Sequence, residues 1–392
     1  MKILFVHEVG YLEKPIFEMH EFPEHLAARG HEVSFVDLPE SPSKPRTWKV
    51  HTENKSRLSN SIDIGLLHQN TWLRGIVGRL AAVVLFPAMF RRALANVRPD
   101  VVVSYSVPTS GWQALRISKR RGIPYVFRAL DVSHKIRQTP FTYLILAAER
   151  HIYRHSDWVS CNNAAMRDYC IQNGASAERS SVNLPPLDLS HFSESKADPK
   201  SLRKKFGLPN SRPILLYMGS FFYFSGLKEV ITSVAELEAK PLLVLIGGGE
   251  QDQELRDLVK ELNLEDHVMF LGYVPYDELP EYLQIGDVAI NPMKPSLVSN
   301  AALPNKVIQY MAAGMPVVCT KLDGVKSLFS NEQGLKFVEG PEELVGASLS
   351  FATENDLGKL GELNRLAVSS RFGLEISISD FEGLLLSLVR SK

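Results

Sequence analysis

The sequence alternates short apolar runs with helical patterns that end at glycine. Lys2–His7 predicts a buried strand, because its apolar residues run together without alternation. A helical pattern from Phe17 to Arg29 ends at Gly30, and Glu32–Asp37 is a second strand-like run. Strand, helix, glycine and strand form a βαβ unit, which implies parallel strands. The chain therefore predicts an α/β fold.

The same pattern recurs in two series. In the first series, further strands are predicted over Asp100–Ser104, Pro124–Ala129 and 156–161, with a helix over Gly111–Arg121. In the second, the predicted strands are Ile214–Met218, Leu242–Ile246, His267–Leu271, Val288–Asn291 and Pro316–Thr320, and the predicted helices are Leu227–Leu237, Gln251–Leu262 and Tyr276–Ile285. Two α/β domains in succession follow from this order.

The segments between and after the two series are polar or helical. Residues 40–60, rich in Pro, Ser, Lys and Arg, predict a surface loop. The pair Pro185-Pro186 and the polar stretch Ser193–Ser201 mark the junction of the domains. We therefore expect domains over residues 1–190 and 191–372. Gly361–Lys392 predicts an amphipathic helix, whose part from about 373 to 392 is expected to pack back on the first domain.

Charge and cysteine content exclude some classes of protein. Lys and Arg together number 44 and so do Asp and Glu, so the net charge gives no reason to expect a nucleic-acid partner. Residues 1–190 hold 24 basic against 17 acidic residues, which leaves 20 against 27 for the rest. Cys161, Cys170 and Cys319 show no metal-binding spacing, so reduced thiols and a cytoplasmic location are expected. The start, MKILFVHEVG, predicts a first strand and not a signal peptide.

A glycine triplet marks a candidate ligand site. Parallel sheets bind ligands outside the carboxyl ends of their strands, and two such sheets on one linker are expected to face each other across a cleft. The strand Leu242–Ile246 runs into Gly247, Gly248 and Gly249, which would let the backbone approach a flat base or a diphosphate. An ordinary strand-to-helix turn is the alternative. Neither a Walker P-loop nor a GxGxxG motif is present there.

The stretch LPNKVIQYMAAGMPVV, Leu303–Val318, predicts a short helix opened by a proline and closed by a glycine. Its first turn offers free N–H groups around Asn305 and Lys306, at the positive end of the helix dipole. Lys306 and Gln309 lie three residues apart on one helix face. A solvated lysine beside a helix cap is the alternative interpretation.

Several of these stretches together resemble one enzyme family. Leu242–Pro292, with its glycine turn, its FLGYVP turn and its GDVAINP strand, is similar to the C-terminal domain of GT-B glycosyltransferases of the retaining family 4. Weaker matches, in the same order as in the family, are Arg29–Asp37, Ile123–Asp131 and Glu149–Ala164. The resemblance implies two Rossmann-like domains, the first binding the acceptor and the second a nucleotide sugar. It also implies retaining transfer from a nucleotide diphosphate sugar to a glycan or lipid-linked acceptor, without a separate cofactor.

The resemblance implies roles for particular residues. Lys306 would neutralise the diphosphate leaving group, Gln309 would contact the ribose, and the turn at Tyr273 and Val274 would present its backbone to the nucleobase. The full implied donor site comprises Gly10, Gly219, Ser220, Gly247, Gly248, Gly249, Tyr273, Val274, Asn300, Ala301, Ala302, Leu303, Asn305 and Gln309, with Lys306 as its catalytic cation.

The chain departs from the family pattern at several positions. The usual pair of glutamates eight residues apart is replaced by Ala301 and Gln309, so the amides around Ser299–Ala302 or the side chain of Asn300 would hold the donor sugar. Two basic residues usual in the phosphate loop are replaced by Ser220 and Ser225. Lys228 and Lys294 are the alternative candidates to Lys306 for neutralising the diphosphate. Only Gly10 remains of the glycines usual after the first strand.

Two residues of the first domain are further catalytic candidates. Asp131 follows the strand PYVFRAL and would orient the acceptor, with a structural helix cap as the alternative, and His134 is a second candidate. The family mechanism is front-face attack, which needs no protein nucleophile. We expect no metal site, since a DxD motif is lacking and scattered carboxylates such as Asp277 and Glu278 are more often solvated.

Thr71–Pro99 holds five arginines and no acid, around an apolar core, Leu80–Phe90, that is too short to span a bilayer. An interfacial helix on anionic lipid and a buried helix of the first domain both fit it. The leading hypothesis is therefore a retaining glycosyltransferase, cytoplasmic and peripheral on the inner face of the membrane. A GT-B nucleotide-sugar epimerase and a non-catalytic GT-B subunit that binds donor or scaffolds a partner are the alternatives.

Overall fold

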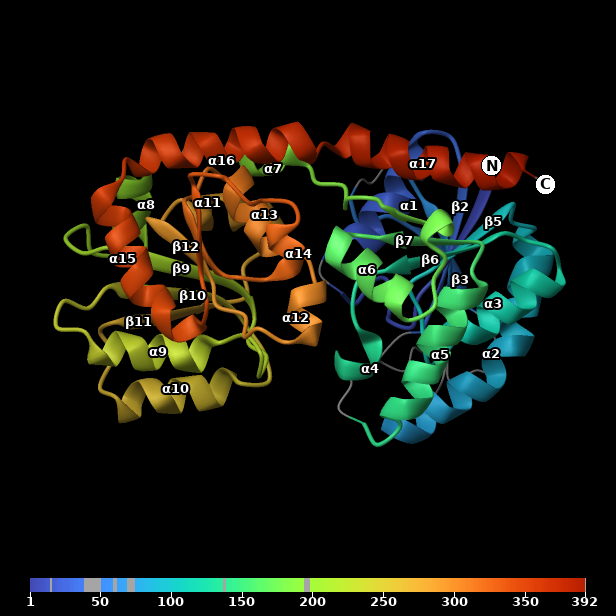
Figure 1. The fold of residues 1–392 in the computed structure, drawn as a ribbon, viewed down its shortest axis with the longest axis horizontal. Coiled ribbons are helices and arrows are strands. Elements are labelled where there is room, and N and C mark those ends of the chain that lie inside the picture. Colours follow the sequence, from blue (N-terminus) through green and yellow to red (C-terminus); the bar gives the residue numbers. More distant parts are fainter. Residues whose placement is uncertain are drawn as a thin grey trace. The chain divides into compact units, whose positions relative to one another are not determined.

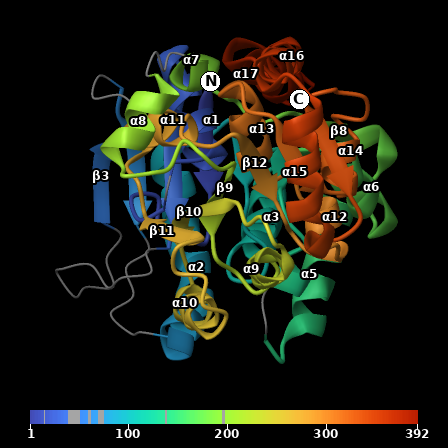
Figure 2. The same cartoon turned by 90° about the vertical axis from the view of Figure 1, so that its left-hand side faces the viewer.

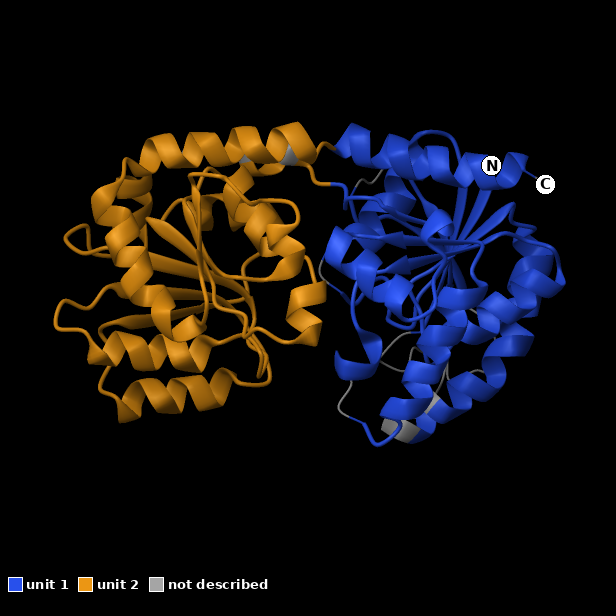
Figure 3. Cartoon of the chain, in the orientation of Figure 1, with its two compact units in different colours: residues 1–186, 374–392 blue, residues 187–373 orange. Residues whose placement is uncertain are grey.

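The computed structural model describes residues 1–14, 16–38, 51–58, 62–68, 75–136, 139–193 and 198–391. The chain divides into two compact units (Figures 1 and 3). Unit 1 comprises Met1–Pro186 and Leu374–Lys392, and unit 2 comprises Leu187–Gly373. Each unit has its own sheet, and the two cores are described in turn.

Unit 1 contains a sheet in the order β3-β4-β2-β1-β5-β6-β7-β8. Its strands pair in parallel except for β3, which is antiparallel to β4. The strands are β1 Lys2–Val6, β2 Glu32–Asp37, β3 His51–Lys55, β4 Ile64–His68, β5 Val101–Ser104, β6 Tyr125–Ala129, β7 Trp158–Cys161 and β8 Ser180–Val182. The predicted parallel α/β arrangement is confirmed.

Helices cover both faces of this sheet. They are α1 Glu18–Ala28, α2 Gly75–Val97, α3 Gly111–Arg120, α4 Ser133–Ile136, α5 Thr142–His155, α6 Ala164–Gln172 and α17 Leu374–Arg390, with a 3-10 turn, η1, at Ala177–Arg179. Alternate residues of β1, β2, β4 and β5 pack with α1 and α17, and the rings of Phe22 and Phe381 lie 4.5 Å apart. Helices α2, α3 and α5 lie on the other side of the strands (Figure 1).

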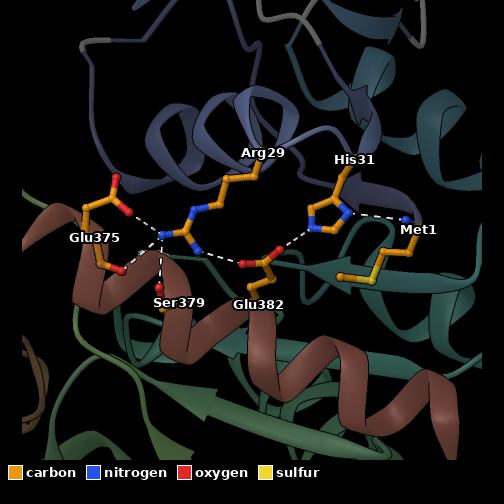
Figure 4. A network of polar contacts seen from close by, with 6 residues as sticks. All are labelled: Met1, Arg29, His31, Glu375, Ser379 and Glu382. Atoms are coloured by element: carbon orange, nitrogen blue, oxygen red, sulfur yellow. Dashed lines mark hydrogen bonds and ion pairs between the residues drawn. The ribbon is translucent and has the colours of Figure 1, made fainter.

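The last helix, α17, is held on unit 1 by charged groups as well as by its apolar face (Figure 4). The Arg29 guanidinium lies 2.6 Å from Glu382 and 2.5 Å from Glu375, and it also donates to the Ser379 hydroxyl. Nε2 of His31 lies 2.6 Å from the second Glu382 oxygen. The Glu382 carboxylate, held by a guanidinium and an imidazole, thus fixes α17 against unit 1.

Two predictions about secondary structure are wrong. Residues 51–55, predicted as loop, form the edge strand β3, whose HTENK sequence is polar because one side of an edge strand faces water. Residues 40–50 and 59–60 of that predicted loop lie outside the described residues. The single helix predicted over Gly361–Lys392 is two helices, because the buried Phe372 is extended between them (φ −113°).

Unit 2 contains a parallel sheet in the order β11-β10-β9-β12-β13-β14. Its strands are β9 Ile214–Ser220, β10 Leu242–Gly248, β11 Val268–Gly272, β12 Val288–Asn291, β13 Val317–Thr320 and β14 Leu335–Val338. Its helices are α7 Leu189–Ser193, α8 Pro199–Lys205, α9 Leu227–Glu236, α10 Asp252–Glu261, α11 Leu279–Leu283, α12 Leu297–Ala301, α13 Asn305–Ala312, α14 Asp323–Lys326, α15 Leu344–Glu354 and α16 Leu357–Arg371, with 3-10 turns η2 at Tyr276–Glu278 and η3 at Pro341–Glu343.

The two faces of the second sheet carry different helices. Side chains of α9, α10 and α15 form one core with Leu215, Tyr217, Leu243 and Leu245 of the central strands. Helix α13 lies on the opposite side, together with α11 (Figures 1 and 2). Both faces of the sheet are thus covered, and the carboxyl ends of its strands are the place where such sheets bind ligands.

Candidate functional site

Helix α13 carries the pair of polar residues that the sequence singled out. Pro304 caps its first turn, and Gly314 ends it in the left-handed region (φ 73°), where a glycine is not strained. Val307, Ile308 and Met311 are buried, whereas Lys306 and Gln309 are half-buried. The amides of Asn305 and Lys306 find no acceptor among the described residues, as expected for a helix start.

Lys306 is not the solvated lysine of the alternative interpretation. Its Nζ donates to the Tyr217 hydroxyl at 2.8 Å and lies 4.1 Å from the centre of the Tyr217 ring. The hydroxyl in turn donates to the carbonyl of Ser220 at 2.9 Å. Burial lowers the pKa of Lys306 to about 7. The surroundings of this amine therefore stabilise its protonated form poorly, unless an anion binds beside it.

Gly219 makes this contact sterically possible. Tyr217 belongs to the core under α9, α10 and α15, and the side chain of Lys306 reaches it by passing over the end of β9. A Cβ at Gly219 would lie 2.8 Å from the Lys306 Nζ, and the φ of 137° also favours glycine there. Gly247 pairs with Gly219 in the sheet, and a Cβ at Gly247 would lie 2.1 Å from the Gly219 carbonyl oxygen.

The remaining residues of the glycine triplet border an exposed tyrosine. Gly248 ends β10, and a Cβ there would lie 3.1 Å from the ring of Tyr273. Gly249 approaches the backbone of Phe221, where a Cβ would lie 2.8 Å from the amide nitrogen. Tyr273 is 77% exposed, and Val274 beside it is half-buried. An exposed ring above a bare strand end is a surface on which a flat base can stack.

In the segment before α13, the amides of Ser299 and Asn300 donate to Ser296, and the Ala302 amide donates to Val298. The expectation that these amides hold the donor sugar is therefore wrong, and the side chain of Asn300 is the remaining candidate. Asn300 lies in α12, and its buried Oδ1 has no hydrogen-bond partner among the described atoms. Ala301 and Leu303 are buried and Ala302 is half-buried. A buried polar atom without a partner is costly, so a ligand that donates to it is favoured.

The two alternative lysines, Lys228 and Lys294, each form an ion pair with a glutamate. Lys228 lies 3.2 Å from Glu254, and Lys294 lies 2.5 Å from Glu229. Among the described residues of unit 2, no carboxylate pairs with Lys306. The structure therefore brings Lys306, Gly219, Ser220 and Gly247 together at the carboxyl ends of β9 and β10, with Tyr217 beneath them.

The predicted residues of unit 1 lie at the carboxyl edge of its own sheet. Gly10 is buried in the loop after β1 and accepts from the Glu13 amide at 3.3 Å. Asp131 is exposed, two residues after β6. His134 is buried in α4, with Nδ1 2.7 Å from Glu149, whose other oxygen accepts from the His134 amide. The Tyr169 hydroxyl donates to the same carboxylate at 3.3 Å.

No group of three or more His, Cys, Asp or Glu side chains suited to a metal ion occurs among the residues whose positions the structure gives. The polar groups of the site are amides, hydroxyls and one amine. Such groups bind an anionic, hydroxyl-rich ligand.

Profiles of two protein families match the chain. "Glycosyl transferase 4-like domain" matches residues 19–185, and "Glycosyl transferases group 1" matches residues 198–362. The chain belongs to the GT4 glycosyltransferases. The putative colanic acid biosynthesis glycosyl transferase WcaI of Escherichia coli K12 is 26% identical to this glycosyltransferase over 324 residues, 76% of this chain and 78% of WcaI.

Solved GT-B structures share the fold of this glycosyltransferase. Sucrose-phosphate synthase from Thermosynechococcus elongatus superposes with a TM-score of 0.80 at 17% identity, covering 100% of this chain and 99% of that one. HepE from Anabaena, solved in complex with UDP-glucose, gives a TM-score of 0.74 at 20% identity over 99% and 100% of the two chains. The prediction of a GT-B fold is confirmed.

Two residues of this glycosyltransferase were missed by the sequence analysis. Tyr217 carries the only hydroxyl in the strand run ILLYM, two residues before Gly219, and that position is its only sequence signal. Glu149 lies on the buried face of α5 with Ile145 and Ile152, at helical spacing. An acidic residue at an apolar position of an amphipathic helix indicates a buried carboxylate, and a buried carboxylate needs a hydrogen-bonding or charged partner.

Proposed function

We propose that this glycosyltransferase moves a hexose from a nucleotide diphosphate sugar to a glycan or glycolipid acceptor, with retention of anomeric configuration. The observation that carries the proposal is the placement of Lys306. A desolvated amine, which no carboxylate of the described residues contacts, lies at the end of a glycine-lined strand, next to the free amides of α13. Such a place suits the diphosphate, and the amides and the helix dipole add to the attraction.

The proposed step breaks the bond between the anomeric carbon and the diphosphate oxygen. The acceptor hydroxyl attacks the anomeric carbon from the leaving group's side, and its proton passes to a phosphate oxygen. Negative charge grows on the diphosphate as the bond breaks, and Lys306 with the α13 amides stabilises it. Removing one such donor typically raises the barrier by roughly 3–4 kcal/mol. Asp131 and His134 are proposed to orient the acceptor.

Relatives support the class of product. WcaI carries colanic acid biosynthesis in its name, and HepE was solved with UDP-glucose. A cell-surface polysaccharide or glycoconjugate as product, and a hexose donor, are proposed by analogy with these proteins. A nucleotide-sugar epimerase would instead change the donor without an acceptor, and a non-catalytic subunit would bind donor without turnover.

The test begins with a thermal-shift panel of UDP, GDP, TDP and ADP sugars, because a ligand well above its dissociation constant stabilises by a few kcal/mol. The donor found is then incubated with a panel of lipid-linked and free oligosaccharides, and the anomeric configuration of the product is read by NMR. Lys306→Ala should abolish transfer, and the matched control Lys228→Ala, a lysine paired with Glu254 in the same unit, should retain it. Undiminished transfer by the Lys306 variant would refute the proposed role.

We also propose that unit 1 docks on the anionic inner face of a membrane through the layer formed by α2, α3 and α5. By length and composition alone, α2 is the one helix of the described residues that could cross a membrane; in its window Leu80–Val97, a third is buried. The stretch Leu80–Phe90 is the apolar middle part of this longer helix, Gly75–Val97. Ala82, Phe86 and Phe90 of α2 are buried, and Gln113 of α3 donates to the Val83 carbonyl, which supports a surface position.

Exposed apolar and basic side chains on this layer support the proposal. Large apolar side chains are exposed near the N-terminal ends of two helices: Val77, Leu80, Val84, Leu85, Phe141, Tyr143 and Leu144. Neither α2 nor α3 contains an acid, and the single acid of α5, Glu149, is buried. Exposed arginines of the three helices are Arg91, Arg92, Arg116, Arg120, Arg150 and Arg154. Apolar side chains flanked by cations favour anionic lipid. Residues 71–74 of the predicted membrane segment lie outside the described residues.

Vesicle co-sedimentation tests the docking. Binding to phosphatidylcholine vesicles that contain phosphatidylglycerol should exceed binding to phosphatidylcholine alone and should fall with added salt. Val84→Glu with Tyr143→Glu should remove most of the binding, whereas Leu366→Glu, on α16 of unit 2, should leave it unchanged. Equal binding to both vesicle types, or binding that survives the double substitution, would contradict the proposal.

A further inference from the structure

We propose that Tyr217 is the positioning residue for Lys306, and that Lys306 takes up one proton from solvent when the diphosphate of a nucleotide sugar binds. The inference rests on the proposed function, because the donor's diphosphate is the anion that drives the uptake. It adds a role for a residue outside the implied donor site and a coupling between donor binding and pH.

The geometry gives Lys306 a neutral partner. Its Nζ contacts the Tyr217 hydroxyl at 2.8 Å and the ring centre at 4.1 Å. The same hydroxyl donates its proton to the Ser220 carbonyl, so it must present a lone pair to the amine. Tyr217 is fully buried, and burial raises the pKa of its hydroxyl, so the tyrosine stays neutral. The tyrosine therefore fixes the direction of the amine without supplying a charge.

The other groups around α13 do not supply a negative charge either. Cys319 of β13 is buried, and burial raises the pKa of its thiol to about 12, so the thiol stays protonated. The neighbouring Asn291 of β12 donates to that sulfur. Tyr310, on α13 itself, uses its hydroxyl to accept from the Met218 amide.

The charged groups of the remaining elements that pack on α13 are engaged elsewhere. Arg365 of α16 donates to the Ala313 carbonyl at the far end of the helix and pairs with Glu362. His191 of α7 lies 3.0 Å from the Tyr276 carbonyl. Lys306 is consequently held by a hydroxyl and a π-face, and no carboxylate in the described part of the chain contacts it.

A buried amine in such surroundings is easily deprotonated. Removal from water disfavours the ammonium form, which brings the pKa of Lys306 to about 7. A diphosphate reverses this effect, because an opposite charge in contact favours the charged form. Between about pH 7 and the ordinary lysine range, the protein binds donor with a neutral lysine at the start and a protonated lysine at the end. The ammonium then has three N–H groups, one for Tyr217 and two for phosphate oxygens.

Isothermal titration calorimetry measures this uptake directly. UDP-glucose is the probe, because its diphosphate lacks the terminal phosphate group that titrates near neutral pH in free nucleotides. Binding enthalpies measured at pH 8 in HEPES and in Tris, whose protonation enthalpies differ, should indicate uptake close to one proton. At pH 6 the uptake should be close to zero. Above about pH 7 the dissociation constant should rise about tenfold per pH unit.

Three variants separate the proposal from a structural role. Lys306→Arg keeps a cation that does not titrate, so it should bind UDP-glucose without proton uptake. Tyr217→Phe keeps the ring and removes the acceptor, so it should weaken binding at pH 8 and move the pH midpoint of the dissociation constant downward. Tyr310→Phe is the matched control, because it removes a buried hydroxyl that contacts Met218 and not the lysine. It should leave the proton uptake and the midpoint unchanged.

Several outcomes would overturn the inference. Donor binding without proton uptake at pH 8 would refute the coupling while the proposed function stands. Uptake that persists in Lys306→Arg would assign the proton to another group. Equal shifts of the midpoint in Tyr217→Phe and Tyr310→Phe would make the Tyr217 effect merely structural. Failure of every nucleotide sugar to bind would overturn the proposed function and this inference together.

Discussion

The buried carboxylate of Glu149 holds His134 at two points: it accepts from the backbone amide at 3.1 Å, and it lies 2.7 Å from Nδ1 of the ring. The other ring nitrogen, Nε2, has no partner among the described residues. A carboxylate on one imidazole nitrogen fixes the ring orientation and the proton on that nitrogen, and it leaves the second nitrogen for a ligand. The pair lies beyond the carboxyl end of β6, where the sequence placed an acceptor contact.

We predict that His134→Phe lowers kcat by about 10²-fold or more, because the acceptor hydroxyl is no longer oriented for attack on the anomeric carbon. Glu149→Gln should lower kcat by about tenfold or more and change its pH profile, because the amide no longer fixes the imidazole proton. Steady-state kinetics with the identified donor measures both effects. Asp168→Asn, on the exposed side of the neighbouring α6, is the control. A kcat equal to that of the unaltered protein in both variants would leave His134 a structural residue.

A second prediction concerns the stability of unit 2. The pKa of Lys306, at about 7, lies below the ordinary 10.5, so the unfolded chain holds more protons between these values. Burial of the charged Lys306 therefore destabilises unit 2 fully below about pH 7, and this destabilisation decreases as the pH rises above 7. Lys306→Met should raise the stability of unit 2 by about 1–3 kcal/mol at pH 6 and by less at pH 9. Thermal denaturation at both pH values checks this.

The control for that experiment is Lys228→Met, which alters a lysine that is half-exposed and paired with Glu254. It should change the melting temperature little at either pH. A lower melting temperature for Lys306→Met than for the unaltered protein at pH 6 would show that the lysine stabilises the fold and would contradict the prediction.

The third prediction compares two glycines of unit 2. Gly219→Ala places a methyl group 2.8 Å from the Lys306 Nζ, so the lysine must leave Tyr217 and donor affinity should fall about tenfold or more. Gly207→Ala also acts on a residue with positive φ, but no atom lies within 4 Å of the new methyl group. It should cost about 1 kcal/mol of stability and leave donor affinity unchanged. Donor titration and thermal denaturation of both variants decide the outcome.

The fourth prediction concerns His68, which lies 2.6 Å from Asp37 and 2.9 Å from Glu53 at the β2–β4–β3 edge. Burial by itself lowers the pKa of His68, but the hydrogen bonds and charges of the two carboxylates outweigh it, and the pKa is raised above 6.5. The stability that protonated His68 contributes is thus complete below about pH 6.5 and is lost as the pH rises through the folded value. His68→Gln should lower the stability of unit 1 by about 1–3 kcal/mol at pH 6 and by less at pH 9. Hydrogen exchange of residues 51–55 at the two pH values should report the same trend, and equal exchange would argue against it.

The parallel sheets could be predicted because their strands are continuous apolar runs such as VVVS, Val101–Ser104, followed by helices that end at glycine. The strand β3 could not, because HTENK carries no apolar pattern and is a strand only through its antiparallel pairing with β4. Local sequence does not record such a tertiary pairing.

The parts of the candidate site that follow from backbone structure could be predicted from the sequence. A predicted strand followed by glycine indicates Gly219 and Gly247, and a position at the start of a predicted helix indicates Lys306. Lys306 belongs to a helix on one face of the sheet, whereas Tyr217 belongs to the core on the opposite face. The lysine side chain reaches the tyrosine by passing over Gly219. No spacing along the chain encodes that path, and so the desolvation of the lysine could not be predicted either.

The docking of α17 on unit 1 makes unit 2 an insertion within a single folding unit. The chain leaves unit 1 after Pro186 and returns to it at Leu374, and the Arg29–Glu382 pair joins two parts of unit 1 that are separated in the sequence by all of unit 2. Exchange of the donor-binding half with a relative therefore requires an internal replacement of residues 187–373. A fusion made at one boundary only would combine the first 186 residues of one protein with the last helix of another. The contact that Phe22 and Phe381 make in this chain would then join residues from two different proteins.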